Sequence, residues 1–192
     1  MAFCFSKFVV FAAISFAVIQ VQADTKTEKE PGVKVDLEHY FTELYAKTCL
    51  ANAANMSLLK DRFLQAEISV LQKDKAAFFL GKQQGTVWII PHVAGDFLVS
   101  IDQRNHCTVY TRNININLVE SYFTDLLESS AQSHKIERIQ DETLAAKQGP
   151  THYISYSRIN RKDYSKQKFK LITSMAQGAK IQAKAIVEEV RR

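Results

Sequence analysis

The chain has 192 residues and a formal net charge of +5 at pH 7, with hydrophobic residues making up 46% of it. This length and composition allow one domain with a core of its own, which excludes a small protein held together only by a disulfide framework. The positive charge is uneven, because residues 141–192 hold 11 basic and 5 acidic residues whereas residues 24–140 hold 13 and 15. Any anionic partner is therefore expected to meet the C-terminal third.

The first 23 residues have the pattern of a secretory signal peptide. Lys7 is their only charge, an apolar run follows over residues 8–19, and the segment closes on Val21-Gln22-Ala23. The run is shorter than the ~20 residues that a membrane-spanning helix needs. We therefore predict export to the periplasm or the extracellular space, with a disordered, charged leader over residues 24–35 and a single domain over residues 36–192.

The domain is predicted to begin with two helices. Asp36 is a typical N-cap, and a stripe of apolar residues at helical spacing follows it up to Cys49. A second helix is expected from Ser57 to about Val70. Residues 72–84 are expected to connect to a sheet, with the apolar run 78–80 packed beneath it.

Three short antiparallel strands are then predicted, over residues 86–90, 97–102 and 107–112. Alternating apolar and polar residues and the turn signals between the segments favour this interpretation. Asn117 and Glu120 form a capping-box pattern, and the clearest amphipathic helix of the chain follows, ending near Ser130.

The remainder is predicted to return to strands. Residues 136–139 are a weak candidate, whereas residues 153–159 and 168–175 alternate clearly. The last segment, from Ile181, fits a strand or a helix, and the short turn at Gly178 favours a strand. The fold class is therefore α+β, with N-terminal helices, an antiparallel sheet of about six to seven strands and one amphipathic helix between two strand groups.

Two cysteines remain if the signal peptide, which contains Cys4, is removed. In an oxidising compartment Cys49 and Cys107 are expected to form a disulfide that fastens the first helix to the sheet. The alternative is that both are buried free thiols.

Three short motifs give the chain a resemblance to a known group of proteins. Thr48-Cys49-Leu50 closes the first helix, Gly85-x-x-Trp88 lies on the first strand and Cys107-x-Val109 on the third. This pattern resembles a family of small exported bacterial proteins of unknown function. The resemblance implies an envelope or secreted location and favours the cysteine pairing, and it transfers no catalytic or binding residue.

Catalytic and metal-binding motifs are missing from the sequence. The five histidines have neither the H-x-x-x-H spacing nor a C-x-x-C partner of common metal sites, and there is no Gly-x-Ser-x-Gly nucleophile motif or Gly-rich phosphate loop. His106 adjoins Cys107, but neighbouring residues of a strand point to opposite faces, which disfavours a thiol nucleophile there. We therefore predict no catalytic residue, no metal and no cofactor.

The most distinctive surface feature is a basic segment over residues 158–170 with interleaved aromatic residues. It is interpreted either as a hairpin that contacts an anionic surface or as a solvated loop whose charges protect a sheet edge. No nucleic-acid-binding motif accompanies it, so nucleic acid is disfavoured as a partner. The candidate contact residues are Arg158, Arg161, Lys162, Lys166, Lys168 and Lys170.

Taken together, the sequence favours an exported, non-catalytic binding or envelope-associated protein whose ligand it does not specify. The partner would be an anionic envelope surface or another exported protein. Two alternatives stay open. One is a secreted hydrolase with an unrecognised site, and the other is an interaction subunit or effector that uses a sheet edge or the basic hairpin.

Overall fold

A computed structural model describes residues 36–93, 95–129, 135–146, 149–159 and 166–190. The predicted signal peptide and leader lie outside these residues. Across the described ranges no helix is long and apolar enough to cross a membrane.

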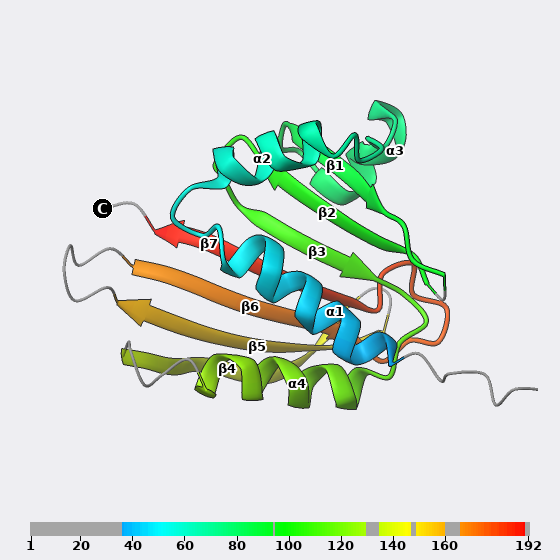
Figure 1. The fold of residues 1–192 in the computed structure, drawn as a ribbon. Helices are drawn as coiled ribbons and strands as arrows, with labels where there is room; N and C mark the ends of the chain where they lie inside the picture. Colours follow the sequence, from blue (N-terminus) through cyan, green and yellow to red (C-terminus); the bar gives the residue numbers. More distant parts are fainter. Residues whose placement is uncertain (1–35, 94, 130–134, 147–148, 160–165, 191–192) are drawn as a thin grey trace, which may run out of the picture. The chain divides into compact units, whose positions relative to one another are not determined.

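Helices precede a seven-stranded antiparallel sheet, and a further helix interrupts the strands (Figure 1). This arrangement confirms the predicted α+β class. The helical elements are α1 (Leu37–Tyr45), a π-helical turn (Ala46–Leu50), α2 (Met56–Gln65), α3 (Lys73–Leu80) and α4 (Ile116–Ser129). The strands are β1 (Gly85–Ile90), β2 (Phe97–Asp102), β3 (Cys107–Thr111), β4 (Lys135–Ala146), β5 (Gly149–Ile159), β6 (Lys166–Ser174) and β7 (Ala183–Val190).

The strand order in the sheet is β1-β2-β3-β7-β6-β5-β4. After β3 the chain crosses to the far edge through α4 and returns strand by strand, so that the last strand lies beside the third. Val109 of β3 is paired with Ala185 of β7. The last segment is thus a strand, as its short turn predicts.

One face of the sheet is covered by helices and contains the core (Figure 1). Helices α1 and α4 pack against each other on this face, and residues from every strand point toward them. Phe97, Val99 and Ile101 of β2 are all buried there, as predicted, but β2 is not half-buried, because Ser100 and Asp102 on its other face are buried as well. Tyr45 of α1 is also fully buried, and its hydroxyl donates to the carbonyl of Ile186 at 3.2 Å.

The ends of two helices test the predicted caps. Asp36 accepts a hydrogen bond from the backbone N–H of His39 at 2.8 Å and caps α1, as predicted. The capping box predicted at Asn117 is wrong. Helix α4 already begins at Ile116, and Asn115 accepts from the backbone N–H groups of Asn117 and Leu118. Glu120 instead points to the sheet and binds His152.

The largest other differences from the predictions concern α2, α3 and β4. Helix α2 ends at Gln65 rather than Val70, because Val70 leaves the helix and bridges to Trp88 at the edge of β1. Residues 73–80, predicted as a connection, form helix α3. Strand β4 has twelve residues rather than four, and a bulge between Arg138 and Gln140 breaks the alternation that would have revealed it.

Candidate functional site: a groove on the open face of the sheet

The two cysteines form the predicted disulfide. Cys49, in the π-helical turn after α1, is bonded to Cys107 of β3, and their Cα atoms are 5.4 Å apart. Both residues are fully buried. The bond joins the helical layer to the centre of the sheet, which leaves neither sulfur free to act as a nucleophile.

The candidate basic residues do not form one cluster in the described part of the chain. Arg161 and Lys162 lie outside the described residues. Arg158 points to the helix-covered side, where its guanidinium donates to Gln167 and lies 5.0 Å from the centre of the Phe169 ring. The candidate lysines of β6, namely Lys166, Lys168 and Lys170, alternate with buried residues and belong to the opposite face. Contact with an anionic surface stays a prediction.

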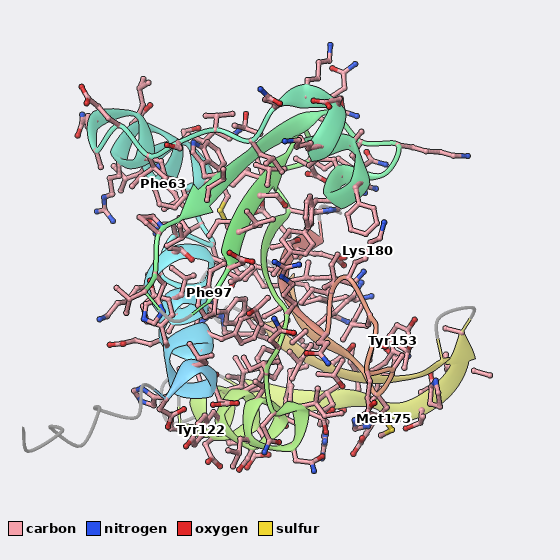
Figure 2. All side chains as sticks on the ribbon, turned by 90° about the vertical axis from the view of Figure 1, so that its right-hand side faces the viewer. Phe63, Phe97, Tyr122, Tyr153, Met175 and Lys180 are labelled. Atoms are coloured by element: carbon pink, nitrogen blue, oxygen red, sulfur yellow. A yellow bond between two sulfur atoms is a disulfide. The ribbon has the colours of Figure 1, made fainter. Side chains whose placement is uncertain are left out.

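A groove lies on the face of the sheet opposite α1 and α4. Helix α3 covers this face over β1, β2 and β3. No helix covers the same face of the remaining strands among the described residues (Figure 2). The groove has a volume of about 730 Å³. Its wall is mainly apolar and aromatic, formed by Leu71, Phe78, Phe79, Ile89, Ile90, Pro91, Phe97, Leu98, Tyr110 and Ile181.

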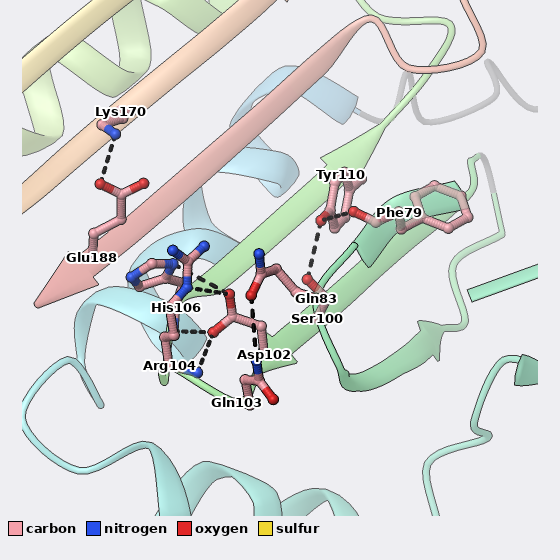
Figure 3. Close-up of polar contacts among 10 residues, drawn as sticks. All are labelled: Phe79, Gln83, Ser100, Asp102, Gln103, Arg104, His106, Tyr110, Lys170 and Glu188. Carbon is pink, nitrogen blue, oxygen red and sulfur yellow. Dashed lines mark hydrogen bonds and ion pairs between the residues drawn. The ribbon is translucent and has the colours of Figure 1, made fainter. Parts of the chain in front are cut away.

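The roof of the groove is fixed to the sheet by a polar network. The Tyr110 hydroxyl on β3 donates to the carbonyl of Phe79 on α3 at 3.1 Å and lies 3.1 Å from the Ser100 hydroxyl of β2 (Figure 3). Burial raises the pKa of Tyr110, so the phenol stays protonated and keeps this donor. The Phe79 and Tyr110 rings also meet edge to face, 5.2 Å apart. Helix α3 is therefore held in place although it is only eight residues long.

Cationic side chains surround this apolar wall. Lys75, Arg112 and Lys180 line the groove, against Asp96 as its only carboxylate among the described lining residues. Arg112 binds Asp96 through its guanidinium, with Nε 3.0 Å from Oδ2. The Lys180 amine lies 5.4 Å from the centre of the Phe78 ring. The rim thus keeps an excess of positive charge.

A second hollow of about 340 Å³ adjoins the groove and shares Phe78 and Ile181 with it. It lies between α3 and the ends of β4, β5 and β6. Tyr153 and Lys184 line it, together with Ile172 and Ser174. In Figure 2, Lys180 and Tyr153 both lie on this open side of the sheet.

Two of the histidines, His106 and His152, take part in polar clusters that belong to the fold, whereas His92 lines the groove. His106 Nδ1 lies 3.2 Å from Asp102, whose carboxylate also accepts from the backbone N–H groups of Arg104 and His106 and so closes the β2–β3 turn (Figure 3). His152 lies between Glu120 and Asp141 on the helix-covered face. Within the described ranges, no group of three or more His, Cys, Asp or Glu residues is arranged to hold a metal ion.

Sequence reasoning did not identify this groove. Phe78 and Phe79 were expected beneath the sheet, and they do face it, but from a helix that forms the roof of a ligand-sized space. No sequence pattern marks Lys184, because it alternates regularly with apolar residues in the last strand. One sequence signal for the groove is the run of three large apolar residues at 78–80. These residues cannot pack against one another within their own segment and therefore need a surface elsewhere in the fold.

Comparisons with known proteins add no relative, since no family model, no curated protein and no solved structure matches the chain. The resemblance to small exported bacterial proteins stays a prediction.

Proposed function

We propose that this is an exported, non-catalytic binding protein that holds an apolar small molecule in the groove beneath α3. The observation that carries the proposal is the groove itself, about 730 Å³ in volume with a mainly apolar and aromatic wall. Ligand pockets in proteins typically have volumes of about 300–1,000 Å³ and are lined in this way.

The groove leaves apolar surface in contact with water. Phe78 and Ile89 are 49% and 39% exposed, although both point into a concave space. Covering such surface is favourable by roughly 25 cal/mol per Å², or about 0.8 kcal/mol for each methylene group that a ligand buries. A flexible hydrocarbon chain could therefore bind through the groove without any specific polar contact.

Export is part of the proposal and rests on two supports. The signal-peptide pattern of residues 1–23 is one. The other is the Cys49–Cys107 disulfide, because disulfides persist in oxidising compartments and are rare in reducing ones. Outside the cell or in the periplasm, an apolar molecule needs a carrier because water dissolves it poorly.

The neutral fluorescent probe N-phenyl-1-naphthylamine tests the groove directly. We expect its emission to rise with the wild-type protein and the rise to be lost in Ile89→Asp, which places a charge on the groove wall at a partly exposed position. Leu64→Asp is the matched control, since Leu64 is 78% exposed on α2 and does not line the groove.

Equal probe binding by Ile89→Asp and Leu64→Asp, with both variants folded, would show that the probe binds elsewhere. Absence of binding by the wild type, and of displacement by any hydrocarbon-chain compound, would reject the groove as a ligand site.

A further inference from the structure

The second hollow differs chemically from the groove that it adjoins. Lys184 is its only charged lining residue among those described, and several hydroxyl groups accompany it. The two spaces share Phe78 and Ile181 as a common wall. The apolar groove therefore adjoins a hollow that offers a cation and hydroxyl groups, with Phe78 and Ile181 bordering both.

Lys184 has no anionic partner in the described part of the chain. The nearest candidate on its own strand, Glu188, binds Lys170 instead, with Nζ 2.6 Å from Oε2 (Figure 3). On the side toward β2, Asp102 is held by His106 and by Arg104, whose Nε lies 3.6 Å from it. Burial, and then the charge of Lys170, lower the pKa of the Lys184 amine. The Lys184 amine is thus half-buried and makes no ion pair among the described residues, although Asp102 and Glu188 line a hollow of about 180 Å³ with it.

Two hydroxyl groups that line the same hollow as Lys184 are able to donate to a ligand. Ser174 accepts a hydrogen bond from the backbone N–H of Ala176 at 3.4 Å, and its own proton has no acceptor among the described residues. The Tyr153 hydroxyl has no hydrogen-bond partner among the described residues. By contrast, Thr151 already donates to the carbonyl of Gly149.

We propose that Lys184 binds the anionic head group of a single-chain amphiphile, such as a long-chain fatty acid, whose apolar chain lies in the groove. This inference rests on the proposed function and deepens it, because it specifies the class of ligand. A bound anion supplies the counter-charge that Lys184 lacks and favours its protonated form. Hydrogen bonds from Ser174 and Tyr153 then orient the head group.

The test compares ligands that share a chain and differ in the head group. Oleate, oleyl alcohol and 1-oleoyl lysophosphatidate are titrated against the full chain, below their critical micelle concentrations, by displacement of N-phenyl-1-naphthylamine. We expect wild type to prefer the two anions over the alcohol by about 10- to 100-fold, which is the range for one hydrogen-bonded ion pair. Tighter binding of oleate assigns a carboxylate head group, and tighter binding of lysophosphatidate assigns a phosphate.

Lys184→Met keeps the length of the side chain and removes its charge. We expect this variant to lose the preference for anions while it still binds oleyl alcohol and the neutral probe. Lys184→Arg keeps the charge and should retain the preference. Lys168→Met is the matched control. Lys168 of β6 lies on the same face of the sheet as Lys184 of β7, and it lines neither the groove nor the second hollow.

The outcomes separate the two proposals. If wild type binds oleate and oleyl alcohol equally, or if Lys184→Met keeps the preference, the head-group assignment is overturned while the groove stands as an apolar site. If neither the probe nor any of the three ligands binds, the proposed function fails as well.

The melting temperature of Lys184→Met should equal or exceed that of wild type, because the variant removes a half-buried amine without a counter-charge.

Discussion

His152 joins three elements of the fold through its two ring nitrogens. On the helix-covered face, Nδ1 lies 3.0 Å from the Glu120 carboxylate of α4, and Nε2 lies 2.8 Å from the Asp141 carboxylate of β4. Thr173 donates to Glu120, and Arg138 binds Asp141 at 2.8 Å. Burial alone would lower the pKa of His152, but the hydrogen bonds with Glu120 and Asp141 outweigh it and raise this pKa above its ordinary value.

This arrangement predicts a pH-dependent stability. A histidine whose pKa is raised by folding contributes stability that is fully present below its unfolded pKa of about 6.5, and that is lost as the pH rises through the folded value. We therefore expect the free energy of unfolding of wild type, measured with urea between pH 5.5 and 8.5, to fall toward high pH relative to that of His152→Gln. Parallel curves for wild type and His152→Gln would contradict the prediction.

At the scale of the elements, the disulfide connects two segments that are 58 residues apart in sequence. The chain-entropy model gives about 4 kcal/mol of stabilisation for closing a loop of this length. We expect the double variant Cys49→Ala, Cys107→Ala to fold and to lose stability of this order in denaturant unfolding. Alanine is preferred over serine because both positions are fully buried, where a hydroxyl group would need a partner.

The same double variant should match the reduced wild-type protein in stability. Alkylation of both thiols in the native, unreduced protein would show that the bond does not form and would remove the basis of this prediction.

How far the elements were predictable depended on which surfaces they bury. Helix α4 buries one regular face, and strand β2 alternates apolar with polar side chains although both of its faces are covered, so their periodicity is clear in the sequence. Helix α3 was not predicted, because its apolar residues at 78–80 are consecutive and do not form an apolar stripe at helical spacing. They cover the sheet, and Phe78 stays half exposed to the groove. Strand β4 is an edge strand that buries almost nothing, so the alternation that marks a strand is weak in it.

The candidate site was less predictable than the elements, for a topological reason. The chain places β7 beside β3 rather than at the end of a meander, and this brings Lys184 next to Tyr110 in the sheet. Phe78 then covers both from a helix more than a hundred residues earlier in sequence than Lys184. Residue spacing alone does not predict a contact between segments that lie so far apart in the sequence. The disulfide was predictable because only two cysteines remained to be paired.

At the scale of the whole molecule, the net charge of +5 and the basic C-terminal third predict attraction to anionic membranes. Lys166 and Lys168 are the members of the predicted basic segment whose side chains are described on the open face without an ion pair. Each basic residue near a charged membrane contributes about 1 kcal/mol, and such attraction is screened over ~10 Å at 0.1 M salt. A carrier attracted in this way could exchange an amphiphilic ligand with the membrane.

The prediction is that the full chain co-sediments with vesicles containing phosphatidylglycerol at low salt and much less at moderate salt. Reversing two charges in Lys166→Glu, Lys168→Glu should weaken this binding by about tenfold or more, since two attractive contributions of about 1 kcal/mol become repulsive. The control is Lys60→Glu, Lys82→Glu, which changes the net charge equally but at α2 and at the turn after α3. Equal losses in the two double variants would assign the attraction to net charge alone. Failure of wild type to sediment at low salt would remove membranes as a partner, and the lysines of β6 would then be solvated charges on the open face of an interior strand.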